Sequence, residues 1–261
     1  MTLVRLGGLS TSTPVLVTGS ASEELHAAVL RAWSRCPAPA HGARDSEHVS
    51  VALDVPGVAS TDADVTGTDL ARVLQSLTQQ VTYAKIAAQR GRLFMMHAGA
   101  VANAEGDTVA FVAPGGTGKT TLIRTMGERF GYLTDETVGV DADASVHPYP
   151  KPLSVRGAPG RPKAETSPDD LGLVRPPAAC TLRRIVLLAR NEAHRGDPRV
   201  EELGRYAAIA ALAPETSALS DLPRPLHWLD GLLAGLQPVV RLHYREVETV
   251  RSLVAGWLEA S

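Results

Sequence analysis

The distribution of apolar and polar residues along the chain predicts an α/β protein. Alternating or continuous apolar runs are typical of strands, whereas apolar residues three and four apart are typical of helices. Strands are expected at residues 14–18, 48–54, 93–103, 108–112, 137–141, 145–156 (broken by prolines), 183–190 and 238–244. Helices are expected at residues 22–33, 69–90, 200–213 and 226–235, and in a last segment with Val247, Val250, Val254, Trp257 and Leu258 on one face.

The connections between these elements add two expectations. Residues 104–107 form a short Gly-containing turn, so the strands on either side of it are expected to make an antiparallel hairpin. Residues 157–179 are rich in proline and glycine and show no periodicity. We expect a mobile surface loop there, a candidate substrate loop or lid.

A glycine-rich stretch lies between the strand at 108–112 and a helical pattern at 121–126. It reads Ala113-Pro-Gly-Gly-Thr-Gly-Lys-Thr120, in the strand–loop–helix order of a phosphate-binding P-loop, with Ala in place of the usual first Gly. Glycines let backbone N–H groups approach phosphate oxygens, and the helix N-terminus adds positive potential. We therefore expect a nucleotide to contact Pro114, Gly115, Gly116, Thr117, Gly118, Lys119, Thr120 and Thr121. Lys119 would reach the β- and γ-phosphates, and the Thr120 hydroxyl would ligate Mg²⁺.

Other motifs limit the class of P-loop protein. The chain has no Leu-Ser-Gly-Gly signature of ABC-type ATPases and no Asn-Lys-x-Asp motif of small GTPases. The apolar strand at 185–189 ends in Arg190, not in the acidic residue of the usual second motif. The acidic pair Asp135-Glu136 follows the loop closely, one short helix and a turn later. A carboxylate there can bind Mg²⁺ and accept a proton from an attacking hydroxyl, although a solvated turn would look the same.

The composition of the chain argues against several other classes of function. The 261 residues include 44% hydrophobic and 21% charged residues, enough for one large or two small globular domains. The net charge of −2 does not favour binding to nucleic acid or to a membrane. No apolar run approaches the roughly 20 residues of a membrane span, and the N-terminal residues lack the pattern of a signal peptide. Cys36 and Cys180 are too few and too far apart for a disulfide scaffold or a zinc site, which fits a cytoplasmic protein.

The order of four motifs is similar to that of a known family. His97-Ala-Gly-Ala-Val, a Gly-Asp turn, the glycine-rich loop and Tyr132-Leu-Thr-Asp-Glu136 resemble the HPr kinase/phosphorylase catalytic core. The resemblance covers about residues 93–156. Tyr149-Pro-Lys-Pro-Leu-Ser154 also looks like a stretch of stand-alone HPr-kinase-related proteins. Such proteins occur beside lasso-peptide biosynthesis enzymes, where some phosphorylate the precursor peptide.

The resemblance implies a fold and a set of residue roles. The fold would be a compact P-loop fold related to phosphoenolpyruvate carboxykinase, a mixed sheet with flanking helices. Residues 93–261 would form the catalytic core, with an N-terminal α/β portion, residues 1–92, packed on it. Asp135 would be the base for the acceptor hydroxyl and a Mg²⁺ ligand, and Glu136 would stand where a second Asp is usual. His97 would lie near the phosphates, although a histidine in a strand can equally be a core residue.

Two departures from the family narrow the expected activity. The late Glu-x-Arg-Gly signature is absent, which argues against HPr as the substrate and against phosphatase activity. The first 92 residues differ from the N-terminal domain of the bifunctional enzymes. Lys151 and Arg156 follow the acidic strand and are candidates for neutralising phosphate charge, with ordinary surface charge as the alternative.

These observations together predict an ATP- and Mg²⁺-dependent kinase. Its acceptor would be a Ser or Thr hydroxyl of a peptide or small protein, for example in ribosomal-peptide biosynthesis. Two alternatives stay open: a small-molecule kinase acting on a serine-like acceptor, and a regulatory nucleotide-binding module or slow NTPase. Because the family often forms oligomers, a homo-oligomer is also open.

Overall fold

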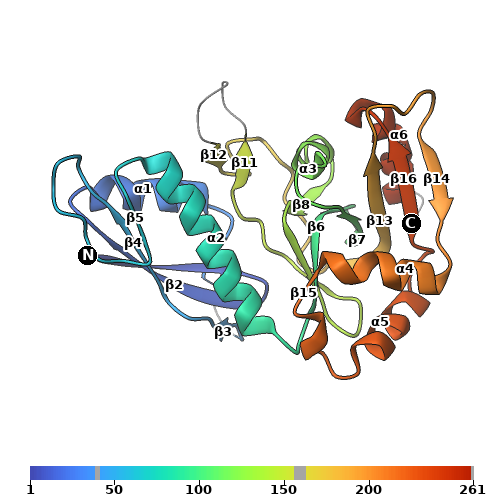
Figure 1. Ribbon diagram of the computed structural model, residues 1–261, viewed down its shortest axis with the longest axis horizontal. Coiled ribbons are helices and arrows are strands. Elements are labelled where there is room, and N and C mark those ends of the chain that lie inside the picture. Colours follow the sequence, from blue (N-terminus) through green and yellow to red (C-terminus); the bar gives the residue numbers. More distant parts are fainter. Residues whose placement is uncertain (39–41, 156–162, 260–261) are drawn as a thin grey trace. The chain divides into compact units, whose positions relative to one another are not determined.

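A computed structural model describes residues 1–38, 42–155 and 163–259, and it contains mixed α/β structure. The chain forms two compact units (Figure 1). Unit 1 contains Met1–Gln89 and Tyr149–Gly172, and unit 2 contains Arg90–Pro148 and Leu173–Ser261. The expected division placed all of 93–261 in one core, so the structure differs from it in grouping residues 149–172 with the N-terminal part.

Unit 1 is built on a sheet in which β1 (Thr2–Gly8) and β2 (Thr11–Thr18) form an antiparallel hairpin. β2 also pairs in parallel with β3 (Arg44–Asp45) and with β4 (Val49–Leu53), and β4 pairs with β5 (Val65–Gly67). The helices α1 (Ser22–Ala32) and α2 (Leu70–Gln89) pack on this sheet. Their apolar faces join the strands in one buried core, as the spacing of the apolar residues predicts.

The inserted segment contributes a small ribbon and a buried side chain to unit 1. β11 (Leu153–Val155) pairs with β12 (Ala164–Thr166), and the ribbon lies against α2. Tyr149 is fully buried in the core of this unit, and its ring lies against Gly8. The prediction of a loop over 157–179 is therefore wrong for residues 164–166, which form β12, whereas residues 167–179 contain no helix or strand. Backbone hydrogen bonds hold this segment, and such bonds do not require a periodic apolar pattern in the sequence.

Unit 2 is built on a mixed sheet that comprises nine strands within the described residues. Its main order is β10 (Val146–His147), β9 (Thr137–Val140), β6 (Phe94–Ala102), β7 (Asp107–Val112), β13 (Thr181–Arg190), β16 (Val240–Tyr244) and β14 (Arg199–Glu202). Two further strands, β8 (Gly131–Thr134) and β15 (Thr216–Ser217), also pair with β6. The predicted hairpin of β6 and β7 is confirmed, and β7, β13 and β16 run parallel to one another.

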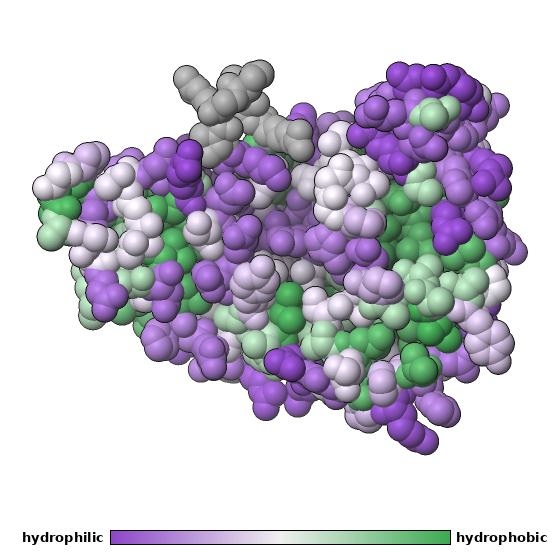
Figure 2. All heavy atoms as spheres, in the orientation of Figure 1, coloured by the Kyte–Doolittle hydropathy of each residue, from purple (hydrophilic) through white to green (hydrophobic). Residues whose placement is uncertain are grey.

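The helices of unit 2 cover both faces of its sheet. α4 (Arg205–Leu212) and α5 (Pro225–Ala234) share a buried cluster with the alternate β6 residues Phe94, Met96, Ala98, Ala100 and Ala102. α3 (Lys119–Gly127) lies against the other face, because a Cβ added to Gly99 would meet Ile123 of that helix. α6 (Val247–Glu259) contacts α3, β7 and β16. Hydrophobic residues reach the surface over the part of unit 2 that contains α4 and α5 (Figure 2). Tyr206 of α4 and Leu226 of α5 are both exposed.

None of the helices in residues 1–38, 42–155 and 163–259 combines the length and hydrophobicity that a membrane span requires.

Candidate functional site

The glycine-rich loop connects the end of β7 to the start of α3. Two of its glycines have backbone conformations that favour glycine, with φ of +84° at Gly116 and +94° at Gly118. The Thr117 hydroxyl donates to the Pro114 carbonyl over 2.8 Å and closes the turn. A Cβ built on Gly116 would meet nothing within 4 Å, so this side of the loop faces open space. The loop can therefore receive a group such as a phosphate from that side.

Lys119 is the first residue of α3, and its side chain is buried beneath the loop. Its ammonium donates to the Ala113 carbonyl over 2.8 Å and to the His97 carbonyl over 3.3 Å. These contacts hold a positive charge where β6 and β7 meet the glycine-rich loop. Thr120 is partly exposed and Thr121 is exposed on the same first turn. The start of α3 thus presents a lysine, two hydroxyls and a helix N-terminus at one place.

His97 lies on β6 and shares a sheet face with α3. Side chains alternate along a strand, so His97 is on the same face as Gly99, which packs against α3. The side chain of His97 is half-buried. Burial, together with the positive charge of Lys119, lowers the pKa of His97, and nearby acidic groups raise it by less. The imidazole is therefore mainly neutral near pH 7.

The acidic pair lies in a break between two strands that both pair with β6. β8 ends at Thr134 and β9 begins at Thr137, and between them the Glu136 carbonyl accepts a hydrogen bond from the Ala98 amide over 3.0 Å. The Asp135 carboxylate is buried and accepts a hydrogen bond from the Tyr132 hydroxyl over 3.3 Å. Both carboxylates are close enough to influence the pKa of His97. The structure therefore brings the predicted residues Lys119, His97, Asp135 and Glu136 together in unit 2.

Glu215 joins this group, although no sequence motif indicates it. It ends the short 3₁₀ helix Ala213–Glu215, and the next residue, Thr216, pairs with Met96 in antiparallel register. That register places Glu215 opposite His97, and its negative charge raises the pKa of the imidazole. Because the residue follows a short irregular turn, no periodic pattern or motif spacing could have indicated it.

Of the two predicted basic residues, Lys151 and Arg156, the structure describes only Lys151. Lys151 lies in unit 1, where its ammonium is buried and donates to the Pro152 carbonyl over 3.0 Å. Arg156 lies outside the described residues, so its predicted role stays a prediction.

The cysteines supply no reactive nucleophile. Both Cys36 and Cys180 are buried and free. Burial raises the pKa of the Cys36 thiol to about 12 and also raises that of Cys180, so both stay protonated at neutral pH.

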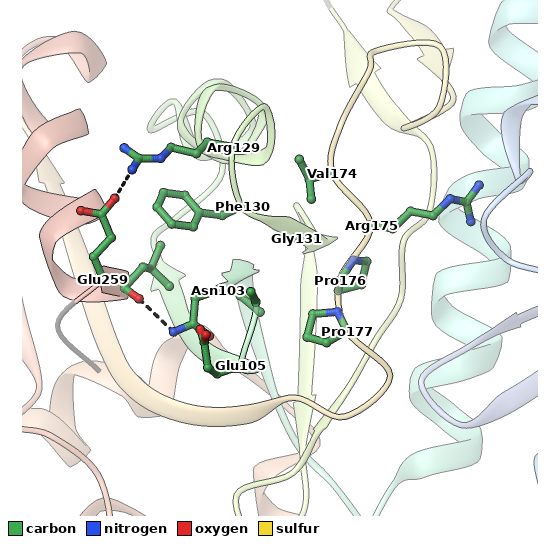
Figure 3. A pocket seen from close by; sticks show the side chains of 13 residues that line it. Asn103, Glu105, Arg129, Phe130, Gly131, Val174, Arg175, Pro176, Pro177 and Glu259 are labelled. Carbon is green, nitrogen blue, oxygen red and sulfur yellow. Dashed lines mark hydrogen bonds and ion pairs between the residues drawn. The ribbon is translucent and has the colours of Figure 1, made fainter.

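A separate cavity of about 610 Å³ lies at the far end of β7 from the loop (Figure 3). On one side Asn103 donates to the Leu258 carbonyl over 2.9 Å, and Arg129 forms an ion pair with Glu259. Asn103 also accepts a hydrogen bond from the amide of Asp107, the first residue of β7, over 2.8 Å. The six residues of β7 separate this cavity from the glycine-rich loop by roughly 20 Å. The cavity therefore does not belong to the group around Lys119.

Comparisons with known proteins add little to this geometry. No protein-family model matches the chain, and no curated protein matches its sequence. One similar solved structure is the Hpr(Ser) kinase/phosphatase from Coxiella burnetii, at 12% identity and a TM-score of 0.32. The match covers 64% of this chain and 94% of that one. At that level of similarity it supports no argument about fold or activity, so the functional argument depends on the residues themselves.

Proposed function

We propose that the chain is an ATP- and Mg²⁺-dependent kinase that transfers the γ-phosphate to a hydroxyl group. The acceptor is a Ser or Thr side chain of a peptide or small protein. One observation carries the proposal: the buried carboxylate of Asp135 is close enough to His97 to affect its pKa, and Lys119, which donates to the His97 carbonyl, begins the helix that the glycine-rich loop opens. A loop of that kind binds phosphate, and a nearby carboxylate gives it an acid–base partner.

Each residue of the group has a distinct role in this proposal. The loop amides and Lys119 bind the β- and γ-phosphates and keep the γ-phosphorus in line with the acceptor oxygen. Asp135 accepts the proton of the acceptor hydroxyl as the new O–P bond forms. Glu136 adds negative charge beside Asp135. His97, being neutral, offers a hydrogen bond without adding a charge.

The donor set also fits Mg²⁺. The Thr120 hydroxyl and the Asp135 carboxylate are hard oxygen donors, and phosphate oxygens complete the coordination of Mg²⁺ in kinases. Among the described residues no three His, Cys, Asp or Glu side chains form a cage of their own, which suits an ion that arrives with the nucleotide. When bound, Mg²⁺ would neutralise phosphate charge.

A small-molecule acceptor is the second candidate, and Glu215 is the observation that favours it. Its partly exposed carboxylate adds a third negative charge near His97, besides those of Asp135 and Glu136. An acceptor that carries an ammonium group next to its hydroxyl, as free serine does, would be attracted to such a site. A regulatory module or slow NTPase would use the same loop without an acceptor.

Intact-mass measurement separates these functions. Candidate peptides and free serine are incubated with the protein, ATP and Mg²⁺, and ADP formation is followed in parallel. A gain of one phosphate on a peptide supports the first candidate, and a gain on serine supports the second. ADP formation with no phosphorylated acceptor supports the NTPase instead.

The Asp135→Asn variant tests the role of the carboxylate. Nucleotide affinity should stay within about threefold of wild type, whereas transfer should fall by about 100-fold or more, the usual contribution of a general base. Asp143→Asn is the matched control, because Asp143 lies in an exposed turn of the same unit. Unchanged transfer in Asp135→Asn would refute the assignment of the base.

A further inference from the structure

Arg190 ends the strand that lies next to the loop-bearing strand. β13 runs parallel to β7, and Leu187 pairs with Val112, the last residue of β7. Arg190 is three residues further along β13, so the strand carries it about 10 Å beyond the end of β7. At that level β7 has already ended, and the glycine-rich loop follows it. In open α/β sheets ligands bind at this carboxyl edge of the parallel strands.

The side chain of Arg190 borders the loop directly. A Cβ built on Gly118 would lie 3.7 Å from Nη1 and 3.8 Å from Cδ of Arg190. Gly118 immediately precedes Lys119, so the guanidinium lies beside the residues that form the phosphate-binding end of the loop. The Arg190 side chain is 34% exposed, so a ligand can reach it.

Two contacts from the other side orient the guanidinium. Its Nε donates to the Arg245 carbonyl over 2.9 Å, and its Nη2 lies 3.7 Å from the Glu246 carboxylate. Neither contact uses Nη1, the nitrogen nearest Gly118. An arginine held in this way loses less side-chain entropy when it binds an anion, and its planar donors match phosphate geometry.

The neighbouring strand β16 places Tyr244 beside Arg190. Tyr244 ends β16 in register with Arg190, and its hydroxyl is buried without a hydrogen-bond partner among the described residues. Burial raises the pKa of Tyr244, and the nearby Arg190 charge opposes that rise. Tyr244 therefore stays uncharged and does not neutralise Arg190. Glu246 approaches the guanidinium at Nη2, whereas Nη1 is the nitrogen that lies nearest Gly118.

We propose that Arg190 binds the γ-phosphate of the nucleotide, an assignment that rests on the proposed function. P-loop NTPases usually have an acidic residue on a second motif strand, where it binds Mg²⁺. Here the strand next to the loop ends in a cation that neutralises phosphate charge, as an arginine finger supplied by the same chain does. The carboxylate for Mg²⁺ comes instead from Asp135, on the opposite side of the loop strand.

The test compares the affinities of the full chain for ATP and ADP by calorimetry in the presence of Mg²⁺. Arg190→Gln should weaken ATP binding by about 10- to 100-fold, the effect of losing a charge-assisted hydrogen bond. ADP binding should weaken by less than about threefold, because ADP lacks the γ-phosphate. Arg184→Gln is the matched control. Arg184 lies on the same strand, but at its other end, with its guanidinium 5.2 Å from the Trp257 ring.

The outcomes separate this inference from the proposed function. If ATP and ADP lose affinity equally, or neither does, the assignment of Arg190 is wrong although the loop still binds nucleotide. If the wild-type chain binds no nucleotide, the proposed function fails and the assignment fails with it. If Arg190→Gln does not fold, as judged by circular dichroism, Arg190→Lys replaces it. That variant keeps the charge and stem but loses the planar donors, and it should still lower the preference for ATP by about threefold or more.

Discussion

Gly99 determines how closely the loop-bearing helix can approach the sheet, and replacing it by alanine tests that packing. A Cβ at this position would lie 2.3 Å from Cγ1 and 2.9 Å from Cδ1 of Ile123 on α3, and 3.2 Å from the Thr134 carbonyl oxygen. Carbon atoms in contact are normally about 3.5–4.0 Å apart, so α3 or Ile123 would have to move by more than about 1 Å. The Gly99→Ala variant should therefore be less stable than wild type.

The sign of the effect is decisive because two contributions oppose each other. Alanine in place of glycine in a strand interior normally stabilises by about 0.5–1 kcal/mol. Overpacking a close-packed core costs about 1–3 kcal/mol. Since the carbonyl of Thr134 also blocks the new methyl group, we expect the second effect to exceed the first. The free energy of unfolding should fall by about 1–2 kcal/mol, and nucleotide affinity should fall with it as Lys119 is displaced.

Urea unfolding monitored by circular dichroism measures this change. Gly231→Ala is the control, because Gly231 lies within α5 and a Cβ there would meet nothing within 4 Å. That variant should be stabilised by about 0.8–1 kcal/mol. Combining Gly99→Ala with Ile123→Ala should cost at least about 1 kcal/mol less than the sum of the single changes. A Gly99→Ala variant that is more stable than wild type would show that the helix does not pack as described.

Two pH dependences follow from the buried bases. Burial lowers the pKa of His97 in the folded state. The stability that neutral His97 contributes is therefore fully present above the unfolded-state pKa near 6.5, and it is lost as pH falls through the lower folded-state pKa. The drop in unfolding free energy between pH 7 and 5 should be smaller in His97→Gln. Burial lowers the pKa of Lys85 to about 8, so the unfolded state binds more protons than the folded state between about pH 8 and 10.5. The free energy of unfolding should therefore rise by up to about 3 kcal/mol over that range. Urea titrations at several pH values measure both, and a flat profile for wild type, or an unchanged rise in Lys85→Met, would contradict the reasoning for Lys85.

The sequence predicts well the elements whose side chains repeat with a clear period. The helix at 69–90, the β6–β7 hairpin and the strand at 183–190 all appear close to their expected bounds, because each buries one continuous apolar face. β1 and β14 were missed. β1 mixes glycine and arginine with its apolar residues, and β14 is largely exposed with few apolar side chains. Such strands are held by backbone pairing with a neighbour, which a single-sequence pattern does not show.

The candidate site was predictable only as far as its residues lie in local motifs. His97, Lys119 and Asp135 stand close in sequence to the loop, so their spacing indicated a common place. Glu215 and Arg190 are brought there by strand pairing across long stretches of chain. Lys151 illustrates the opposite case, since its nearness in sequence to the acidic strand did not put it in the same unit. Register and topology, which depend on contacts far apart in the chain, decide such cases.

The insertion of residues 149–172 into unit 1 means that neither unit corresponds to one continuous piece of the gene. A fragment ending at residue 89 would lack Tyr149, whose ring fills the space against Gly8, and would lose the β11–β12 ribbon. A fragment starting at residue 90 would carry that segment with its buried residues exposed to water. During synthesis, unit 1 can therefore complete its core only after residues up to about 172 have left the ribosome. By then most of the residues around the glycine-rich loop have already been made.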